Sequence, residues 1–284
     1  MSKKVIISAD STSDLPSELV EKYGIVIVPL HVVLDGNTYD DMVNITPDEI
    51  YAHFEKTGTL PKTSAVNMQE YIDTFKPYVD EGCEVVHLNI GSALSTSHQQ
   101  CKLAAKELGN VYPVDSCSLS TGTALLALEA VEMAQQGMSG KEIAEKLSAM
   151  TSKIHCHFIV DKLNYLHAGG RCSAVALLGA NLLGIKPCIE VSNKDGSMTV
   201  GKKYRGKLTK VLSQYANDKL SECDNPYRKR AFLVHAGIPQ ETIEELYKLV
   251  DEKKCFDEII ISRASCTISS HCGPGTMGII FMED

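Results

Sequence analysis

The first half of the chain alternates short apolar runs with longer stretches in which apolar residues recur at helical spacing. The clearest unit begins with an apolar run at residues 85–90, is interrupted by Gly91, and continues at residues 99–108 with alanine and leucine on one side. Apolar runs at residues 4–9 and 111–114 follow the same rhythm. This alternation predicts a parallel sheet covered by helices on both faces, with the loops at the carboxyl ends of the strands free to hold a ligand.

The rhythm changes near residue 155. Residues 185–191 and 198–203 are expected to form strands joined by a hairpin, a connection that the first half lacks. Further elements are expected as strands at 231–235, 258–262 and 277–282 and as helices at 208–223 and 240–253. We therefore predict an α/β fold with an N-terminal three-layer α/β domain at residues 1–155 and a second, α+β domain at residues 156–284.

Three local predictions concern the loops around the N-terminal sheet. Residues 25–34 are expected to form one strand that Pro29 interrupts, and residues 57–64 are expected to be a loop. Asp14 is expected to cap the helix that follows it in the sequence.

A loop rich in hydroxyl groups follows the apolar run at residues 85–90. It carries Ser92, Ser95, Thr96 and Ser97 directly before the expected helix. The first turn of a helix leaves main-chain N–H groups unpaired, so such a loop can hold an anion without a full positive charge. One serine or threonine at this place would be typical of a simple helix cap. Four hydroxyl groups in six residues favour an anion site but do not identify the ligand.

The net charge argues against a nucleic-acid-binding protein, and the sequence shows no sign of a secreted or membrane-spanning protein. A net charge of −8 argues against a nucleic-acid surface, which needs clustered lysine and arginine. The chain begins Met-Ser-Lys-Lys without an apolar stretch of signal-peptide length, and no apolar run is long enough to span a membrane. We therefore expect a cytoplasmic protein.

The 10 cysteines are scattered through apolar segments, which is typical of buried thiols in a reducing compartment. No Cys-x-x-Cys pair occurs. The groups around His155-Cys156-His157 and Cys266 with His271-Cys272 lack the spacing of structural zinc sites, so we expect no metal site.

Six short motifs occur in one order along nearly the whole chain, and together they resemble those of the DegV family. The motifs are Asp10-Ser-Thr-Ser-Asp-Leu-Pro16, Lys62-Thr63-Ser64, Leu94-Ser95-Thr96-Ser97, Tyr165-Leu-His-Ala-Gly-Gly-Arg171, Gly184-Ile-Lys-Pro187 and His271-Cys-Gly-Pro-Gly275. The sequence departs from the usual pattern of the family at Ala65-Val66, at Thr96 and at His98.

The resemblance implies a protein whose two domains enclose a long-chain fatty acid. Some members of the family serve as the lipid-carrying subunit, FakB, of bacterial fatty acid kinase, in which a separate ATP-binding subunit phosphorylates the carboxylate for phospholipid synthesis. The resemblance places the carboxylate ligands at Thr63, Ser95 and His271, with Thr96 beside them in the same loop. It implies a carrier without catalytic residues of its own and without a cofactor other than the bound fatty acid, such as palmitate.

The chemistry of these residues suits such a ligand. A C16 chain has about 14 methylenes, so at roughly 0.8 kcal/mol each its burial is worth on the order of 11 kcal/mol before the costs of association. The ionised head needs hydrogen bonds when it leaves water, and the hydroxyl groups of Thr63 and Ser95 can donate them. A protonated His271 would add positive charge.

Each of these residues also has a purely structural interpretation. Thr63 can turn the loop after Pro61, and His271 can be a structural donor. Arg171 can pair with a nearby acid and hold its loop, or it can contact the kinase subunit or the transferred phosphoryl group. The apolar segment at residues 174–183 is either core or a wall of the acyl tunnel.

Two other functions remain as alternatives. A small-molecule kinase or phosphatase on a related fold would need a nucleotide site, but the sequence has no Walker A motif and no G-x-G-x-x-G loop. A hydrolase using Ser95 or a cysteine with His271 would be expected to carry a G-x-S-x-G elbow, which is also missing.

Overall fold

The N-terminal half is built on a parallel sheet. The structure, a computed structural model, describes residues 3–172, 184–221 and 226–284, without the side chains of residues 226–228. The sheet has the order β2-β1-β6-β7, and its strands are β1 (Val5–Asp10), β2 (Val26–Val28), β6 (Glu84–Asn89) and β7 (Val111–Asp115). All its pairs are parallel, and β6 is buried along its whole length, as expected for a central parallel strand.

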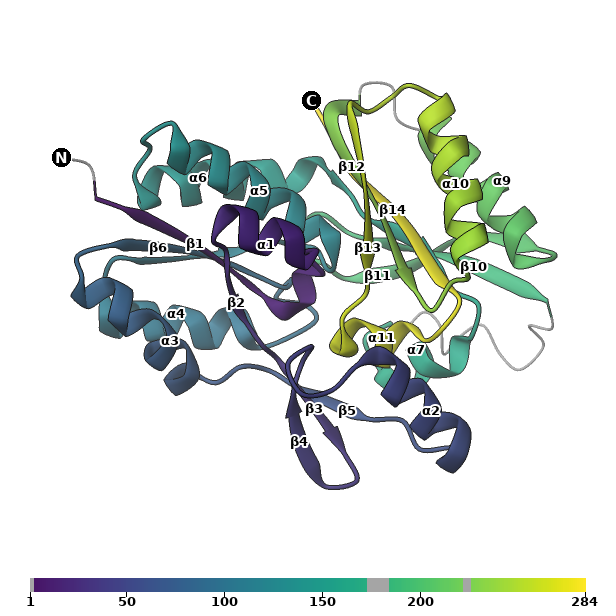
Figure 1. Ribbon diagram of the computed structural model, residues 1–284, viewed down its shortest axis with the longest axis horizontal. Coiled ribbons are helices and arrows are strands. Elements are labelled where there is room, and N and C mark those ends of the chain that lie inside the picture. The colour runs from purple at the N-terminus through teal and green to yellow at the C-terminus, as the bar shows by residue number, and fades with distance from the viewer. Residues whose placement is uncertain (1–2, 173–183, 222–225) are drawn as a thin grey trace.

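Helices cover both faces of this sheet (Figure 1). On one face α3 (Met68–Asp80) and α4 (Ser97–Leu108) pack on a cluster that includes Ile6 and Val85. On the other face α1 (Ser17–Tyr23), α5 (Thr121–Gln135) and α6 (Gly140–Met150) pack on Ile7 and Val86, the next residues along the same strands. The predicted three-layer α/β architecture is confirmed.

The second half contains a mixed seven-stranded sheet. Its path is β11-β10-β9-β14-β12-β13, with β8 paired to β14. The strands are β8 (Ile154–His155), β9 (His157–Ile159), β10 (Ile185–Val191), β11 (Met198–Arg205), β12 (Pro226–Ala236), β13 (Glu258–Arg263) and β14 (Thr276–Glu283). Helices α9 (Leu208–Ser221) and α10 (Gln240–Glu252) pack on one face, so the predicted α+β architecture and the β10–β11 hairpin are confirmed.

A small three-stranded sheet corrects two local predictions. It has the order β4-β3-β5, with β3 (His31–Leu34), β4 (Asn37–Asp40) and β5 (Lys62–Ser64). The single strand expected at residues 25–34 is wrong, because the chain leaves the parallel sheet after Val28 and Pro29 has no N–H to continue the ladder. The loop expected at residues 57–64 is also wrong at its end, since β5 pairs with β3.

Helix α5 lies between the two large sheets. Its residues 121–131 are all buried, and it contacts β1 and β6 on one side and β12 and β14 on the other. One apolar cluster therefore contains residues of both halves, such as Leu88 and Ile280. The division at residue 155 stays a prediction, and the segment at residues 174–183 lies outside the described residues.

The remaining elements surround the region where the three sheets approach one another. They are the turns η1 (Ser11–Ser13) and η2 (Thr151–Lys153) and the helices α2 (Pro47–Thr57), α7 (Leu163–Gly169) and α11 (Cys266–Cys272). Within the part of the chain that the structure describes, no helix combines the length and the apolar character needed to span a bilayer.

Candidate functional site

A cavity of about 440 Å³ brings the predicted site residues together. Its lining includes Thr63 on β5, Ser95 and Thr96 before α4, Arg171 after α7, and His271 near the end of α11. Four separate segments of the chain thus meet at one opening. The cavity shows that these side chains share a site, while their assignment as carboxylate ligands stays a prediction.

Thr63 and His271 form a direct pair across the cavity wall. The Thr63 hydroxyl and His271 Nε2 are 2.8 Å apart, and the two residues are 208 positions apart in the sequence. If the ring carries its proton on Nε2, it donates to the Thr63 oxygen and leaves the hydroxyl hydrogen free to donate to a ligand. The pair is therefore a means of aiming one hydroxyl donor.

His271 is neutral at neutral pH. Burial, with a smaller effect from the positive charge of Arg171, lowers the pKa of His271 to about 4. In the protein without a ligand, the expected positive charge on His271 is therefore absent, because desolvation disfavours the protonated ring. The charge at the site comes from Arg171 instead.

The two glycines before Arg171 have different tasks. A side chain at Gly169 would place its Cβ 2.2 Å from His271 Nδ1, so only glycine allows the helix to lie against the imidazole. Gly170 ends α7 in the left-handed region with φ +67°. Arg171 then turns back, and its Nη1 donates to the Gly169 carbonyl at 2.8 Å. Among the described residues no acid forms an ion pair with the exposed guanidinium, which is held by the main chain.

Ser95 has a structural role in addition to its place on the cavity. Its Oγ lies 2.9 Å from Ser97 Oγ and accepts a hydrogen bond from Ser97 N at 3.2 Å, so it caps the first turn of α4. Thr96 occupies the N-cap position but makes no capping bond with its side chain, and it is exposed. The predicted helix cap and the cavity wall are thus formed by the same loop.

An apolar slot of about 50 Å³ adjoins this cavity. Leu119, Met198, Ile268 and His271 line both spaces. Deeper in, the slot is lined by apolar side chains of the seven-stranded sheet and α7, namely Phe158, Leu166, Val234 and Ile280. The slot is therefore far smaller than the cavity that it adjoins. The sequence analysis did not single out these residues, because apolar strand residues in a slot look the same as those in an ordinary core.

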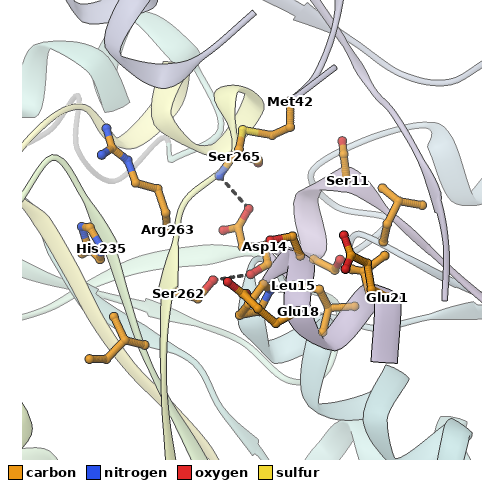
Figure 2. Close-up of a pocket in the computed structure, with 16 residues that line it drawn as sticks. Ser11, Asp14, Leu15, Glu18, Glu21, Met42, His235, Ser262, Arg263 and Ser265 are labelled. Atoms are coloured by element: carbon orange, nitrogen blue, oxygen red, sulfur yellow. Dashed lines mark hydrogen bonds between the residues drawn. The ribbon is translucent and has the colours of Figure 1, made fainter. Parts of the chain in front are cut away.

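Two buried carboxylates next to the site were also missed. Asp14 accepts a hydrogen bond from Ser265 N at 2.8 Å (Figure 2). Asp41 accepts one from Cys266 N, also at 2.8 Å. Asp14 was expected to cap α1, and this is wrong. The chain turns at Asp14 in the left-handed region with φ 53°, and its carboxylate bonds to the start of α11 instead.

The carboxylate of Asp14 lies at a second cavity, of about 590 Å³, between α1 and β13 (Figure 2). Glu18, Glu21, His235 and Arg263 also line this cavity. It contains none of the predicted site residues. Among the described residues, no group of three or more His, Cys, Asp or Glu side chains could hold a metal ion.

Comparisons with known proteins agree with the fold. The model of the DegV family, whose members are described as uncharacterised, matches residues 4–284. A DegV domain-containing protein of Clostridium perfringens is 31% identical over 291 residues, covering 99% of this chain and 98% of the relative.

Several solved structures are similar over the whole chain. A Thermus thermophilus DegV family protein, described by its fatty acid binding, has a TM-score of 0.91 at 28% identity and covers 99% of this chain and 100% of its own. A Thermotoga maritima protein reported to reveal a fatty acid binding function has a TM-score of 0.84 at 31% identity, with 99% of each chain covered. DegV of Bacillus subtilis, described as a fatty acid binding protein, has a TM-score of 0.83 at 26% identity over 100% of both chains.

Proposed function

The chain belongs to the DegV family, and from this premise we propose that it binds a long-chain fatty acid. The carboxylate occupies the cavity at Thr63 and Arg171, and the acyl chain enters the apolar slot. The observation that carries this proposal is the position of the Thr63–His271 pair, where a cavity that contains hydroxyl groups and Arg171 shares His271 with an apolar slot. A fatty acid has the same polarity, with an anionic head joined to a hydrocarbon tail.

The head of the ligand is met by hydroxyl groups and one cation. The Thr63 hydroxyl, aimed by neutral His271, donates to one carboxylate oxygen, and hydroxyl groups of Ser95 and Thr96 are available to the other. Arg171 supplies positive charge from the exposed side of the cavity. Charge-assisted hydrogen bonds of this kind offset the desolvation of a carboxylate.

The tail supplies most of the affinity. Burying about 14 methylenes at roughly 0.8 kcal/mol each exceeds what a few hydrogen bonds at the head contribute net. The slot must widen to take the chain, because its volume is only about 50 Å³. Met198 lies where the slot meets the cavity, and its unbranched side chain can move aside at small energetic cost.

We further propose that the protein presents its lipid to a separate ATP-binding kinase subunit, as the lipid-carrying subunits of the family do. The carboxylate would lie in a cavity that includes the exposed residues Thr96 and Arg171, so a partner could reach it without removing the tail. In this proposal the chain itself catalyses nothing. It works in the cytoplasm, where its nine described cysteines stay as free thiols.

The proposal is tested by what the purified protein contains. After gentle purification, lipid extraction and mass spectrometry should recover a fatty acid in a ratio of one molecule per chain. Protein stripped of lipid should then bind added palmitate. A protein that is recovered empty and also fails to bind palmitate would contradict the proposal.

Variants at the head test the site within the same assay. Replacing Thr63 and Ser95 together by alanine should leave folding nearly intact but reduce the lipid recovered, because the carboxylate loses two donors. Thr63→Ser keeps the hydroxyl and serves as the matched control, with lipid recovery near that of the parent protein. Equal recovery from all three proteins would show that the head lies elsewhere.

A further inference from the structure

The start of α11 is held by two carboxylates from the other half of the chain. Ser265 N donates to Asp14, Cys266 N donates to Asp41, and Ile268 N donates to the Ser265 side chain as a normal helix cap. The first N–H groups of a helix have no partner within it. At α11, three of them are satisfied, two by acids that lie more than 220 positions earlier in the sequence.

Both acids are almost completely buried, with Asp14 4% and Asp41 1% exposed. Each carboxylate accepts a second hydrogen bond, from Ser120 Oγ at 2.5 Å for Asp14 and from Ser11 Oγ at 2.8 Å for Asp41. Burying a carboxylate is costly even when it is hydrogen-bonded, and a neutral serine or asparagine can cap a helix. A cap from the helix's own segment, such as Ser265, would not tie α11 to the N-terminal half, whereas these two side chains do.

The position of Asp41 connects it to the headgroup site. Asp41 directly follows β4, and β4 and β5 both pair with β3 in the small sheet. Strand β5 carries Thr63, which bonds to His271 near the other end of α11. The same small sheet thus contacts α11 at both ends, through Asp41 at its start and through Thr63 near its end.

We propose that Asp14 and Asp41 are positioning residues that fix α11 against the N-terminal half and thereby hold His271 at Thr63. A helix of seven residues is only about 10 Å long, so a shift at its start is passed to His271 almost undiminished. The inference rests on the proposed function, because it identifies what sets the geometry of the proposed carboxylate site.

Two readouts test this role, and one of them needs no lipid. In the ligand-free protein, ¹⁵N NMR of the histidine rings should show Asp41→Ala shifting the His271 signals and raising the His271 pKa from about 4 toward its ordinary value. In the lipid-loaded protein, Asp41→Ala should speed the transfer of labelled palmitate to phosphatidylcholine vesicles by about tenfold, as expected for the loss of a buried hydrogen bond.

Matched variants separate positioning from general destabilisation. Asp41→Asn keeps an acceptor for Cys266 N, so the His271 signals and the rate of palmitate transfer should stay close to those of the parent protein. Asp40→Asn changes the neighbouring acid on the same sheet, whose side chain is 46% exposed, and should alter neither readout. In a His271→Ala background, Asp41→Ala should speed palmitate transfer no further. Asp14→Ala should shift the His271 signals in the same direction as Asp41→Ala, because it removes the acceptor of Ser265 N.

The outcomes separate the inference from the proposed function. Unchanged His271 signals in folded Asp41→Ala and Asp14→Ala would overturn the inference, and so would equal effects of Asp41→Ala on transfer with and without His271. If Asp41→Ala does not fold, Asp14→Ala and Ser11→Ala, which removes a donor to Asp41, decide it by the same NMR measurement. Wild-type protein that binds no palmitate overturns the proposed function, and the NMR result still decides the positioning role.

Discussion

His271 is kept neutral by burial, and this changes what the site offers a carboxylate. The ring orients the Thr63 hydroxyl instead of pairing with the head as a cation. Arg171 is the cation in the cavity lining, and it is exposed, so solvent screens its attraction. In the proposed function the head would therefore be held with moderate strength, which suits a carrier whose ligand must react and leave.

The low pKa of His271 makes stability depend on pH with a definite sign. An unfolded histidine binds its proton near pH 6.5, whereas folded His271 binds one only near pH 4. Between these values the unfolded state binds more protons, so stability falls as pH falls. In denaturant titrations from pH 7 to pH 5, His271→Gln should lose less stability than the parent protein, by about 1.4 kcal/mol per pH unit at full effect.

The pKa of Asp14 is shifted in the opposite sense, so a variant at Asp14 should change the pH dependence of stability in the opposite direction. Burial raises its pKa from 3.8 to about 7, against the lowering effect of its bonds to Ser120 and Ser265. Between pH 3.8 and about 7 the folded state binds more protons than the unfolded state, so the contribution of Asp14 to the stability of the protein falls as pH rises. Asp14→Asn should therefore steepen the loss of stability on acidification. Parallel pH curves for the parent and both variants would contradict these ionisation states.

The site residues that the sequence analysis found share one property. Thr63, Ser95, Arg171 and His271 are polar groups in motifs with glycine or serine neighbours, and such groups can be recognised without coordinates. The ionisation of His271 could not be predicted in the same way, because its burial is created by segments far away in the sequence. The same reason hid the role of Asp14, whose hydrogen-bond partner Ser265 is 251 positions away.

At the scale of elements, the end of α7 determines whether His271 can reach Thr63. Alanine normally stabilises a helix relative to glycine, by about 1 kcal/mol. Gly169→Ala should nevertheless weaken palmitate retention, because the new Cβ would lie 2.2 Å from His271 Nδ1 and push the ring from Thr63. Retention can be measured by transfer of labelled palmitate to vesicles.

Gly170→Ala is the control on the same helix end. Nothing lies within 4 Å of a Cβ at Gly170, but its φ of +67° is strained for alanine. This variant should lose about 1 kcal/mol of stability and retain palmitate normally. If Gly169→Ala retains palmitate as well as Gly170→Ala does, the close packing of α7 on His271 is not needed for binding.

Elements with a strong apolar pattern were predicted well, and short elements were not. Strand β6 and helix α4 follow directly from residues 85–90 and 99–108. The three residues of β5 carry no such pattern. Their pairing with β3 was missed because residues 25–34 were predicted to form one strand, so β3 was not recognised as a separate strand. Thr63 was therefore identified by its motif while its strand was missed.

In the whole molecule, the slot lies on the face of the seven-stranded sheet that is turned toward the N-terminal half. Phe158, Val234 and Ile280 line it from the sheet, and Leu119 lines it from the segment just before α5. These residues belong to the apolar cluster that joins both halves. In the proposed function, loading a lipid would therefore separate part of the same core that holds the halves together, and the tail would replace the contacts that are lost.

The central claim is that the tail enters this slot while the head stays at Thr63, and the position of a labelled tail tests it most directly. A crystal of the protein with palmitate brominated at its terminal carbon would give the bromine position by anomalous scattering. We expect one bromine peak between the seven-stranded sheet and α5, beyond His271 as seen from Thr63. A peak in the cavity between Asp14 and Arg263, or on the outer surface, would contradict the account.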